Sequence, residues 1–425
     1  MRLLLVGAFP YPHHQGSQVY FQEQAIALRA AGADVELLTY ASRGPVGDDL
    51  DRWRALDGFR HHKAPAWTAP SGLRSGPSLA KPLADLGLAY AINDAIASSI
   101  YDNASFDCIM THNIEASIVS ALCGMTRSSA GPPVVYCVHT MMENELSSYS
   151  KWLKPKSITP DSCFADRMSS RVKRVIDTLG GRLDRFAARS SDGWIALTHS
   201  SDCVMKSASS SPGALIAPPI PDLRHRLFPI DAEDTCLRHK LVPDHYILYS
   251  GNLDAYQELD QLKAAVQSLE HTRTDLMLLP IVIASHDPGV LALKDHADGL
   301  EVRHVETDHE MQGLISAARA TITLRRAEGG FPIKLANSLA WGTAPIVFHG
   351  LEWGLSHHQD AWVADPERPE ESLAEAILSL SRDASLARQL GIGARRRYET
   401  AHTPRVVAER TLALIEEVRL GRPAG

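Results

Sequence analysis

Short apolar runs alternate with amphipathic stretches along most of the chain. Residues 3–9 (LLLVGAF) form a continuous apolar run, which is typical of a parallel strand buried on both faces. A helix is predicted over residues 18–31, because Ser17 can cap its start and Gly32 can end it. Residues 33–40 (ADVELLTY) then predict a second strand. The chain therefore begins with a strand–helix–strand unit.

The alternation continues toward the C-terminus. Further strands are predicted at residues 106–113, 132–140, 192–200, 245–253, 277–285, 300–306, 320–326, 343–349 and 361–365. Helical patterns lie at residues 115–125, 171–190, 259–270, 309–320 and 404–421. Residues 213–229 are rich in proline and are interpreted as a linker. We therefore expect an α/β protein with two doubly wound, Rossmann-like domains that face each other across a cleft.

The length of 425 residues is too great for one ordinary domain. We assign residues 1–212 to a first domain and residues 213–403 to a second, and we expect the helix within 404–425 to pack back on the first. Ligands of doubly wound sheets bind outside the carboxyl ends of the strands. The polar segments predicted at those ends are residues 9–17, 112–113, 139–145 and 198–199.

Composition and charge exclude several classes of protein. A hydrophobic content of 44% is that of a globular protein, and a net charge of −7 without a basic stripe argues against nucleic acid as a partner. No run of 18 apolar residues is present, so we expect no transmembrane segment, and the short apolar start fits a buried strand better than a signal peptide. The six cysteines lack C-x-x-C spacing, which predicts reduced thiols in a cytoplasmic protein. No histidine pair has a partner at metal-ligand spacing.

The segment EGGFPIKLANSLAWG, residues 328–342, suits a negatively charged group such as a phosphate. Gly329 and Gly330 allow the backbone to approach a ligand closely, and Pro332 fits a helix start because it has no N–H. Lys334 then lies in the first turn, where the amide groups of the helix also attract an anion. The alternative is that the glycines are only a loop and that Lys334 is a solvated surface charge.

The helix predicted in this segment has two faces. One face carries Lys334, Asn337, Ser338 and Trp341. The other face is predicted to be buried and carries Leu335, Ala336, Leu339 and Ala340.

Four segments, together and in this order, resemble glycosyltransferase family 4, the retaining nucleotide-sugar transferases of the two-Rossmann B fold. They are PYPHHQGSQ at residues 10–18, VHT at 138–140, YSGNLDAYQELDQL at 249–262 and RRAEGGFPIKLANSLAWGTAPIV at 325–347. The resemblance covers nearly the whole chain. It implies that the donor lies mainly on the second domain and the acceptor on the first. It also implies that no cofactor is needed beside the nucleotide-sugar substrate.

Two positions depart from the glutamates of the family pattern. Asn337 stands where the family has a glutamate that contacts the nucleotide ribose. An amide can also donate and accept there, and the alternative is an ordinary polar helix position. Glu328 is displaced by one residue from the glutamate that contacts the transferred sugar. Either Glu328 contacts the sugar from a shifted loop, or backbone amides contact the sugar in place of the glutamate.

The cations that usually bind the diphosphate are also absent. Asn252 and Gln257 stand in their places. The candidate replacements are Arg325, Arg326 and Lys334. Because adjacent residues of a strand point to opposite faces, we expect at most one of the two arginines to serve.

In the first domain, Gly16 and Ser17 open a helix after a strand and suit a phosphate or sugar hydroxyls. His139 resembles the acceptor-side histidine of the family, and its alternative is a structural histidine at a strand end. His112 and Glu143 are weaker candidates beside it. The Asp49-Leu50-Asp51 pattern lies in a polar stretch and is interpreted as chance.

The expected function is transfer of a sugar from a UDP- or GDP-linked donor to a small-molecule acceptor, with retention and without metal. Alternatives are a catalytically silent sugar-nucleotide-binding protein and an epimerase on the same fold. The expected catalytic residues are His139 and Glu328. The expected substrate-binding residues are Gly16, Ser17, His112, Glu143, Asn252, Arg325, Arg326, Gly329, Gly330, Phe331, Lys334 and Asn337.

Overall fold

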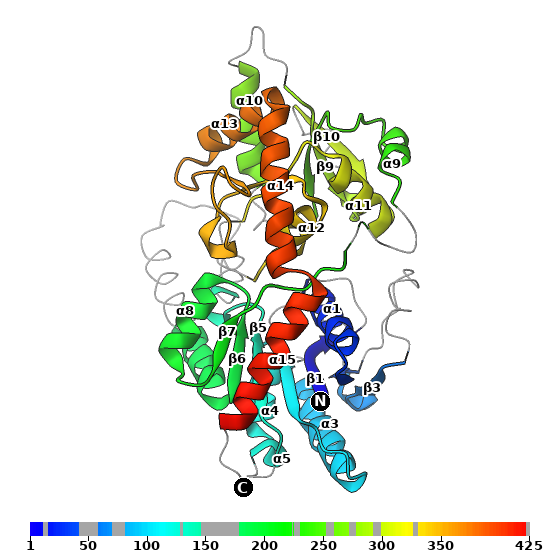
Figure 1. Cartoon of the computed structure of the whole chain (residues 1–425), viewed down its shortest axis with the longest axis vertical. Coiled ribbons are helices and arrows are strands. Elements are labelled where there is room, and N and C mark those ends of the chain that lie inside the picture. Colours follow the sequence, from blue (N-terminus) through cyan, green and yellow to red (C-terminus); the bar gives the residue numbers. More distant parts are fainter. Residues whose placement is uncertain are drawn as a thin grey trace, which may run out of the picture. The chain divides into compact units, whose positions relative to one another are not determined.

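The structure is a computed structural model of the chain. It describes residues 1–11, 16–41, 58–69, 81–127, 131–145, 178–222, 224, 230–251, 259–271, 278–291, 299–325 and 330–421. Internal contacts divide the chain into two compact units. One is formed by Met1–Pro219 with Pro404–Gly425, and the other by Ile220–Thr403. Each unit is built around one parallel sheet (Figure 1).

The first unit contains a seven-stranded sheet in the order β3-β2-β1-β4-β5-β6-β7. Its strands are β1 Arg2–Pro10, β2 Asp34–Tyr40, β3 Arg60–Lys63, β4 Cys108–His112, β5 Val134–Val138, β6 Gly193–Ala196 and β7 Gly213–Leu215. All its strand pairs are parallel. The order reverses at β1, as in doubly wound folds, and the carboxyl ends of all these strands lie at one edge.

Helices cover this sheet. They are α1 Gly16–Ala30, α3 Lys81–Tyr101, α4 Ile114–Leu122, α5 Gly124–Arg127, α8 His199–Ala208 and α15 Pro404–Gly421, with a short turn η1 at Ala66–Thr68 and further helical residues at 178–190. Leu4 and Ile109 of the sheet pack with apolar residues of α3 and α4 in one core. The C-terminal helix α15 packs against α1 and β6 (Figure 1).

The second unit contains a six-stranded parallel sheet in the order β10-β9-β8-β11-β12-β13. Its strands are β8 Ile247–Ser250, β9 Ile281–Ser285, β10 Leu300–His304, β11 Ala320–Thr323, β12 Ala344–Val347 and β13 Trp362–Val363. Its helices are α9 Ala232–Arg238, α10 Leu259–His271, α11 Asp308–Ala317, α12 Ile333–Trp341, α13 Pro369–Arg382 and α14 Ala384–Ala401, with a short turn η6 at Leu351–Trp353.

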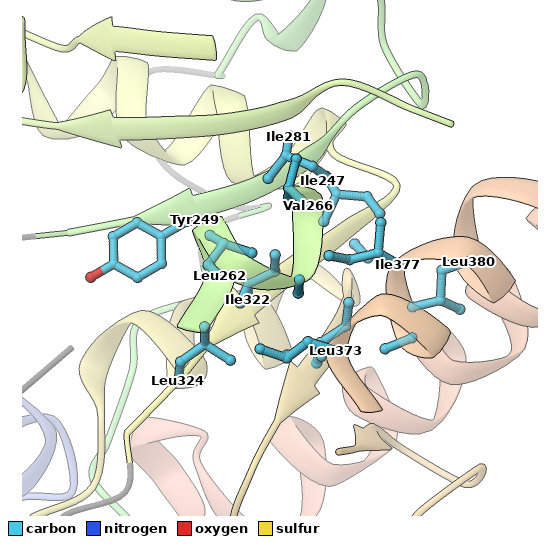
Figure 2. Packing of buried hydrophobic residues seen from close by; sticks show 14 of the residues in the cluster. Ile247, Tyr249, Leu262, Val266, Ile281, Ile322, Leu324, Leu373, Ile377 and Leu380 are labelled. Carbon is cyan, nitrogen blue, oxygen red and sulfur yellow. The ribbon is translucent and has the colours of Figure 1, made fainter. Parts of the chain in front are cut away.

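The sequence of the central strand β8 is a continuous apolar run because both faces of the strand are buried. Ile247 and Tyr249 face a core that α10 and α13 complete (Figure 2). Leu248 points to the opposite face, into a second core that includes residues of α9 and α11. Since successive side chains of a strand alternate between faces, both faces of this sheet must be apolar.

Three local predictions are corrected. Gly213–Leu215 belong to the first sheet, as β7 pairs with β6, so the predicted linker begins too early. The helix α1 starts at Gly16, and Ser17 therefore lies inside the helix rather than capping it. The edge strand β3 was not predicted, because its sequence, RHHK, has no apolar residue.

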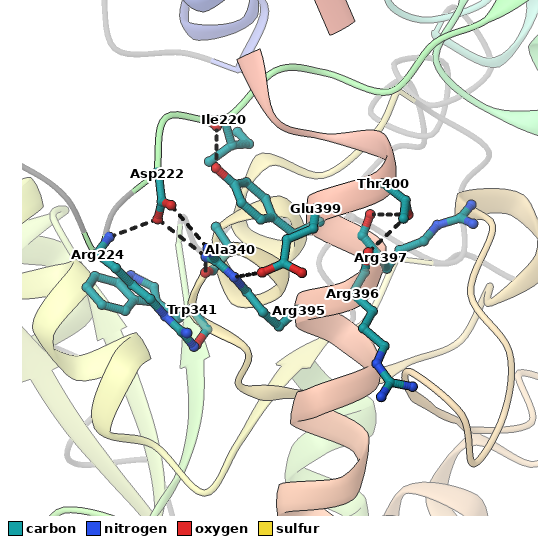
Figure 3. Close-up of polar contacts among 11 residues, drawn as sticks. Ile220, Asp222, Arg224, Ala340, Trp341, Arg395, Arg396, Arg397, Glu399 and Thr400 are labelled. Carbon is teal, nitrogen blue, oxygen red and sulfur yellow. Dashed lines mark hydrogen bonds and ion pairs between the residues drawn. The ribbon is translucent and has the colours of Figure 1, made fainter. Parts of the chain in front are cut away.

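The segment that enters the second unit is fastened to α14. Tyr398 donates a hydrogen bond from its hydroxyl to the Ile220 carbonyl at 3.1 Å. Arg395 donates to both oxygens of Asp222, at 3.4 and 3.1 Å, and also to the Ala340 carbonyl at the end of α12 (Figure 3). This arginine therefore connects three pieces of backbone that are far apart in sequence.

Two absences hold for the part of the chain that is described. No helix there is long and apolar enough to span a membrane. The cysteines described there, which are Cys108, Cys123, Cys137, Cys203 and Cys236, are free thiols. Cys163 lies outside the described residues.

Arg395→Ala should destabilise the second unit by about 2 kcal/mol, because charged hydrogen bonds to Asp222 and a partly buried carbonyl are lost. For a unit of this size, that corresponds to a melting temperature lower by roughly 4–8 °C. Circular dichroism melting of the full chain measures it. Arg396→Ala is the matched control, since Arg396 is exposed one residue further along the same helix. Equal melting temperatures for the two variants would contradict this account.

Candidate functional site

The first backbone amides of α12 are not capped by any side chain. Pro332 is the N-cap, and the first turn contains no acidic residue. The helix forms because its apolar face, including Leu335 and Leu339, is fully buried. It ends at Gly342, whose φ of 73° is the left-handed conformation of a C-cap. The positive end of the helix dipole therefore lies at this N-terminus without a side-chain anion in the first turn, which favours binding of an anion.

Lys334, in the first turn of α12, lies at the carboxyl end of β8. Its Nζ is 4.1 Å from the centroid of the Tyr249 ring. A β-carbon placed on Gly251 would lie 3.8 Å from the same Nζ. Gly251 has a φ of 125°, so a side chain there would also strain the backbone. The fold thus brings together the two glycine-containing segments that the sequence singles out.

A second cation lies beside Lys334. Arg325, which follows β11, donates from Nη1 to the Gly330 carbonyl at 3.2 Å. Burial lowers the pKa of Lys334 to about 7, and the positive charge of Arg325 adds to this effect. Two like charges near an open helix N-terminus favour a negatively charged ligand.

Other residues predicted on this segment have different environments. Phe331 is buried, and its ring centroid lies 4.9 Å from that of His402. Asn337 is half-buried on α12. The helical face that carries Ser338 and Trp341 also packs inward: Ser338 accepts from Thr321 at 2.9 Å in the core, and Trp341 donates to Gln312 at 2.9 Å.

Four predicted residues lie outside the described residues and keep their sequence-based roles as predictions. They are Asn252, Arg326, Glu328 and Gly329. The Asp49-Leu50-Asp51 pattern also lies outside.

In the first unit, His112 and His139 form a buried pair at the ends of β4 and β5. His112 Nδ1 and His139 Nε2 are 2.9 Å apart, and one of these nitrogens donates to the other. His112 is fully buried, and His139 is 5% exposed. Burial lowers the pKa of His139 to about 3 and the pKa of His112 well below its ordinary range. Both rings are therefore neutral at pH 7, and the acceptor-side role of His139 stays a prediction.

The helix α1 supplies the other side of this pair. The Tyr20 ring centroid lies 4.9 Å from that of His139, and the Phe21 centroid lies 4.9 Å from that of His112. Gly16 is exposed and Ser17 is half-buried in the first turn of the same helix. The histidine pair thus packs against Tyr20 and Phe21, about one turn along α1 from Gly16 and Ser17.

The loop after β5 is held by a residue that sequence reasoning missed. Asp184 accepts backbone N–H groups from Met142 at 2.9 Å and from Glu143 at 3.1 Å. Burial raises the pKa of Asp184 to about 6, and the two backbone hydrogen bonds oppose this rise. Glu143, a predicted substrate contact, is exposed at this turn.

Tyr249 and Asp184 could not be identified as site residues from sequence patterns. Tyr249 is a buried position of a strand, and only the fold shows that Lys334 lies over its ring. Asp184 lies in a helical segment far along the chain from the turn that it holds. Among the described residues, no group of three or more histidine, cysteine, aspartate or glutamate side chains could hold a metal ion.

Comparisons with known proteins show the family and the fold of the chain. Residues 15–201 match the family described as glycosyl transferase 4-like domain, and residues 244–383 match glycosyl transferases group 1. One curated relative is alpha-maltose-1-phosphate synthase of Mycolicibacterium smegmatis, 27% identical over 184 residues. That match spans 42% of this chain and 42% of the relative, so it covers less than half of either protein.

Two solved structures share the whole architecture. Anabaena HepE in complex with UDP has a TM-score of 0.66 at 11% identity, over 98% of this chain and 100% of that one. Sucrose-phosphate synthase of Thermosynechococcus elongatus has a TM-score of 0.68 at 16% identity, over 98% of each chain. At these identities the likeness shows the fold, which is that of two-domain B-fold glycosyltransferases.

The buried histidine pair predicts that the first unit loses stability in acid. The folded rings stay neutral while unfolded rings take up protons below their ordinary pKa of 6.5. Their contribution is present above pH 6.5 and is lost as the pH falls toward 3, and for His139 the loss at pH 5 is about 2 kcal/mol. Melting temperatures of the full chain between pH 7 and 5 should therefore fall, and they should fall less for His139→Gln.

The control is His245→Gln, because His245 is exposed. It should keep the acid sensitivity of the parent. An identical pH profile for His139→Gln and the parent would mean that the pair does not carry this linkage.

Proposed function

The chain belongs to the glycosyltransferases of family 4, and on that premise we propose that it transfers a hexosyl group from a nucleotide-diphosphate sugar to a small-molecule acceptor. The bond between sugar C1 and the diphosphate oxygen breaks, and a bond forms from C1 to the nucleophilic atom of the acceptor. The acceptor's proton passes to the leaving diphosphate on the same face, so that the anomeric configuration is retained. This reaction needs no dedicated base.

The observation that carries the proposal is the meeting of Lys334, Arg325 and the open start of α12 at the end of β8. Breaking the sugar–phosphate bond moves negative charge onto the diphosphate. A preorganised group of cations and amides stabilises that charge more in the transition state than in the ground state. Lys334 is the principal diphosphate cation in this proposal, in place of the cations missing at Asn252 and Gln257.

UDP is the first donor nucleotide to test. HepE, which shares the fold, was solved with UDP and also with UDP-glucose. GDP is the alternative base, and Asn337 is the proposed contact to the ribose. We propose that the first unit binds the acceptor, with His139 and the turn at Glu143 closest to it. The reaction is proposed to use no metal ion, so transfer should persist in EDTA.

A silent sugar-nucleotide-binding protein is the competing function, because two customary cations are replaced at Asn252 and Gln257. A screen of UDP- and GDP-sugars by thermal shift and nucleotide release separates the two. Binding with release of nucleotide from the sugar supports the transferase. Binding without any release supports the silent protein.

Lys334→Met should weaken UDP binding by at least about tenfold at pH 7, because a charge-assisted phosphate contact is lost. Methionine keeps an apolar chain over Tyr249, so stability without ligand should change little. In the parent, affinity should also fall as the pH rises above 7, by up to about tenfold per unit, because binding then requires Lys334 to take up a proton. Isothermal titration calorimetry at pH 7 and pH 8.5 measures both effects.

Lys240→Met is the matched control, since Lys240 is an exposed lysine of the same unit. It should bind UDP like the parent at each pH. If Lys334→Met also binds UDP like the parent, Lys334 is not a diphosphate ligand, and the phosphate site must be sought elsewhere.

A further inference from the structure

The C-terminal end of α12 is held by two arginines. The last four carbonyl groups of a helix have no partner within the helix, so their donors must come from elsewhere. Arg395 of α14 donates to the Ala340 carbonyl, and Arg224 donates to the Trp341 carbonyl (Figure 3). A guanidinium group at this end also complements the negative end of the helix dipole. The two cations therefore stabilise the end of α12 that lies opposite to Lys334.

The other two carbonyls at this end also have donors. Gly342 donates from its backbone N–H to the carbonyls of Ser338 and Leu339. The Thr343 N–H also donates to the Ser338 carbonyl, at 3.0 Å. All four terminal carbonyls of α12 are thus satisfied, while no side chain caps the amides at its start. The N-terminal amides, and not the C-terminal carbonyls, are the groups of this helix that a ligand can satisfy.

One carboxylate holds both arginines. Asp222 accepts from Arg395 Nη1 at 3.4 Å and from Nη2 at 3.1 Å, and it also accepts the backbone N–H of Arg224 at 3.2 Å. Arg395 donates further from Nε to Glu399 at 2.8 Å. The side chain of Arg395 is 15% exposed and that of Asp222 is 33% exposed, so the pair is partly shielded from water. A planar guanidinium makes these bonds at once, whereas a lysine ammonium cannot reproduce the fork.

The backbones of α12 and α14 touch at this end. A β-carbon on Gly391 would lie 2.3 Å from the Gly342 carbonyl oxygen, which is closer than a side-chain carbon can approach. A β-carbon on Gly342 would in turn lie 3.1 Å from the Gly391 carbonyl oxygen. The end of α12 therefore cannot shift toward α14, and the bonds of Arg395 oppose a shift away from it.

The same helix α14 also contacts the residue that leads into α12. Phe331 has its ring centroid 4.9 Å from that of His402. His402 is the C-cap of α14, and its backbone N–H donates to the Tyr398 carbonyl at 2.8 Å. Contacts with α14 thus fix α12 at its C-terminal end and just before its start. Because a helix of nine residues is only roughly 14 Å long, a tilt that follows the loss of Arg395 would displace Lys334 at the other end.

We propose that Arg395 and Arg224 are positioning residues for the diphosphate of the donor. By holding the last carbonyls of α12, they fix the place at which Lys334 and the first amides of the helix meet the phosphates. Asp222 supports both arginines. That the anion is the diphosphate of the donor rests on the proposed function. The inference goes further, because it assigns an effect on phosphate binding to side chains at the opposite end of the helix.

The test compares UDP with uridine, which lacks the phosphates, as probes for the full chain. Dissociation constants come from NMR titrations at pH 7, far below the melting temperature of every variant. Arg395→Ala should weaken UDP binding by about fivefold, a coupling of the size found between groups joined through a backbone shift. Its effect on uridine should stay within about twofold, as for independent sites. Arg224→Ala should show the same pattern with a smaller loss, because Arg224 is exposed.

Three further variants separate position from charge. Arg395→Lys keeps the positive charge but not the fork, so it should resemble Arg395→Ala. Gly391→Ala adds a methyl group between the two helices without changing any charge, and it should also weaken UDP more than uridine. Arg396→Ala is the matched control: it removes a charge from an exposed residue of the same helix and should bind UDP like the parent.

A double variant tests whether the effect passes through α12. In Lys334→Met the phosphate contact of Lys334 is already lost, so adding Arg395→Ala should weaken UDP binding by no more than about twofold. A residue that supports only the fold would have the same effect in both backgrounds. The inference is overturned if Arg395→Ala and Arg395→Lys bind UDP like the parent. Equal weakening of UDP and uridine overturns it too, and so does an effect that Lys334→Met leaves unchanged.

The proposed function is judged separately, by release of nucleotide from a UDP- or GDP-sugar. A chain that binds UDP without turnover loses the proposed transfer and keeps this inference, since the comparison needs only binding. A chain that binds GDP instead is tested with GDP and guanosine in the same variants. If neither nucleotide binds, or if Lys334→Met binds the nucleotide like the parent, the diphosphate site at α12 is wrong and the inference falls with it.

Discussion

The desolvated ammonium of Lys334 over the Tyr249 ring is the interaction on which the donor side depends. Burial and a neighbouring arginine both act against this charge and lower its pKa to about 7. A ring face offsets part of that cost, since a cation near an aromatic face is attracted to it. The remaining cost is relieved when an anion binds. In the proposed function, that anion is the diphosphate of the donor.

The first unit also buries titratable side chains, but burial there favours their neutral forms. His112 and His139 avoid the cost of burial by remaining neutral and bonding to each other. Asp85 and Glu145 are also partly buried, and burial raises the pKa of both carboxyl groups, which favours their neutral forms as well.

Much of the fold could be predicted because buried parallel strands leave continuous apolar runs. The run at residues 3–9 and the run before Ser250 both became central strands. The edge strands β3 and β7 escaped prediction, since an edge strand needs few apolar residues. The family resemblance located the segments of Lys334 and His139. It could not show that Ser338 and Trp341 bond inward, or that Asp184 holds the turn at Glu143, because those contacts join residues far apart in sequence.

The central claim is that the start of α12 and Lys334 bind the diphosphate of the donor. A crystal structure of the full chain with UDP tests it most directly. The account predicts a phosphate oxygen about 3 Å from Lys334 Nζ and another within hydrogen-bond distance of the first backbone amides of α12. A diphosphate bound elsewhere, with Lys334 still lying over Tyr249 and touching no phosphate oxygen, would contradict it.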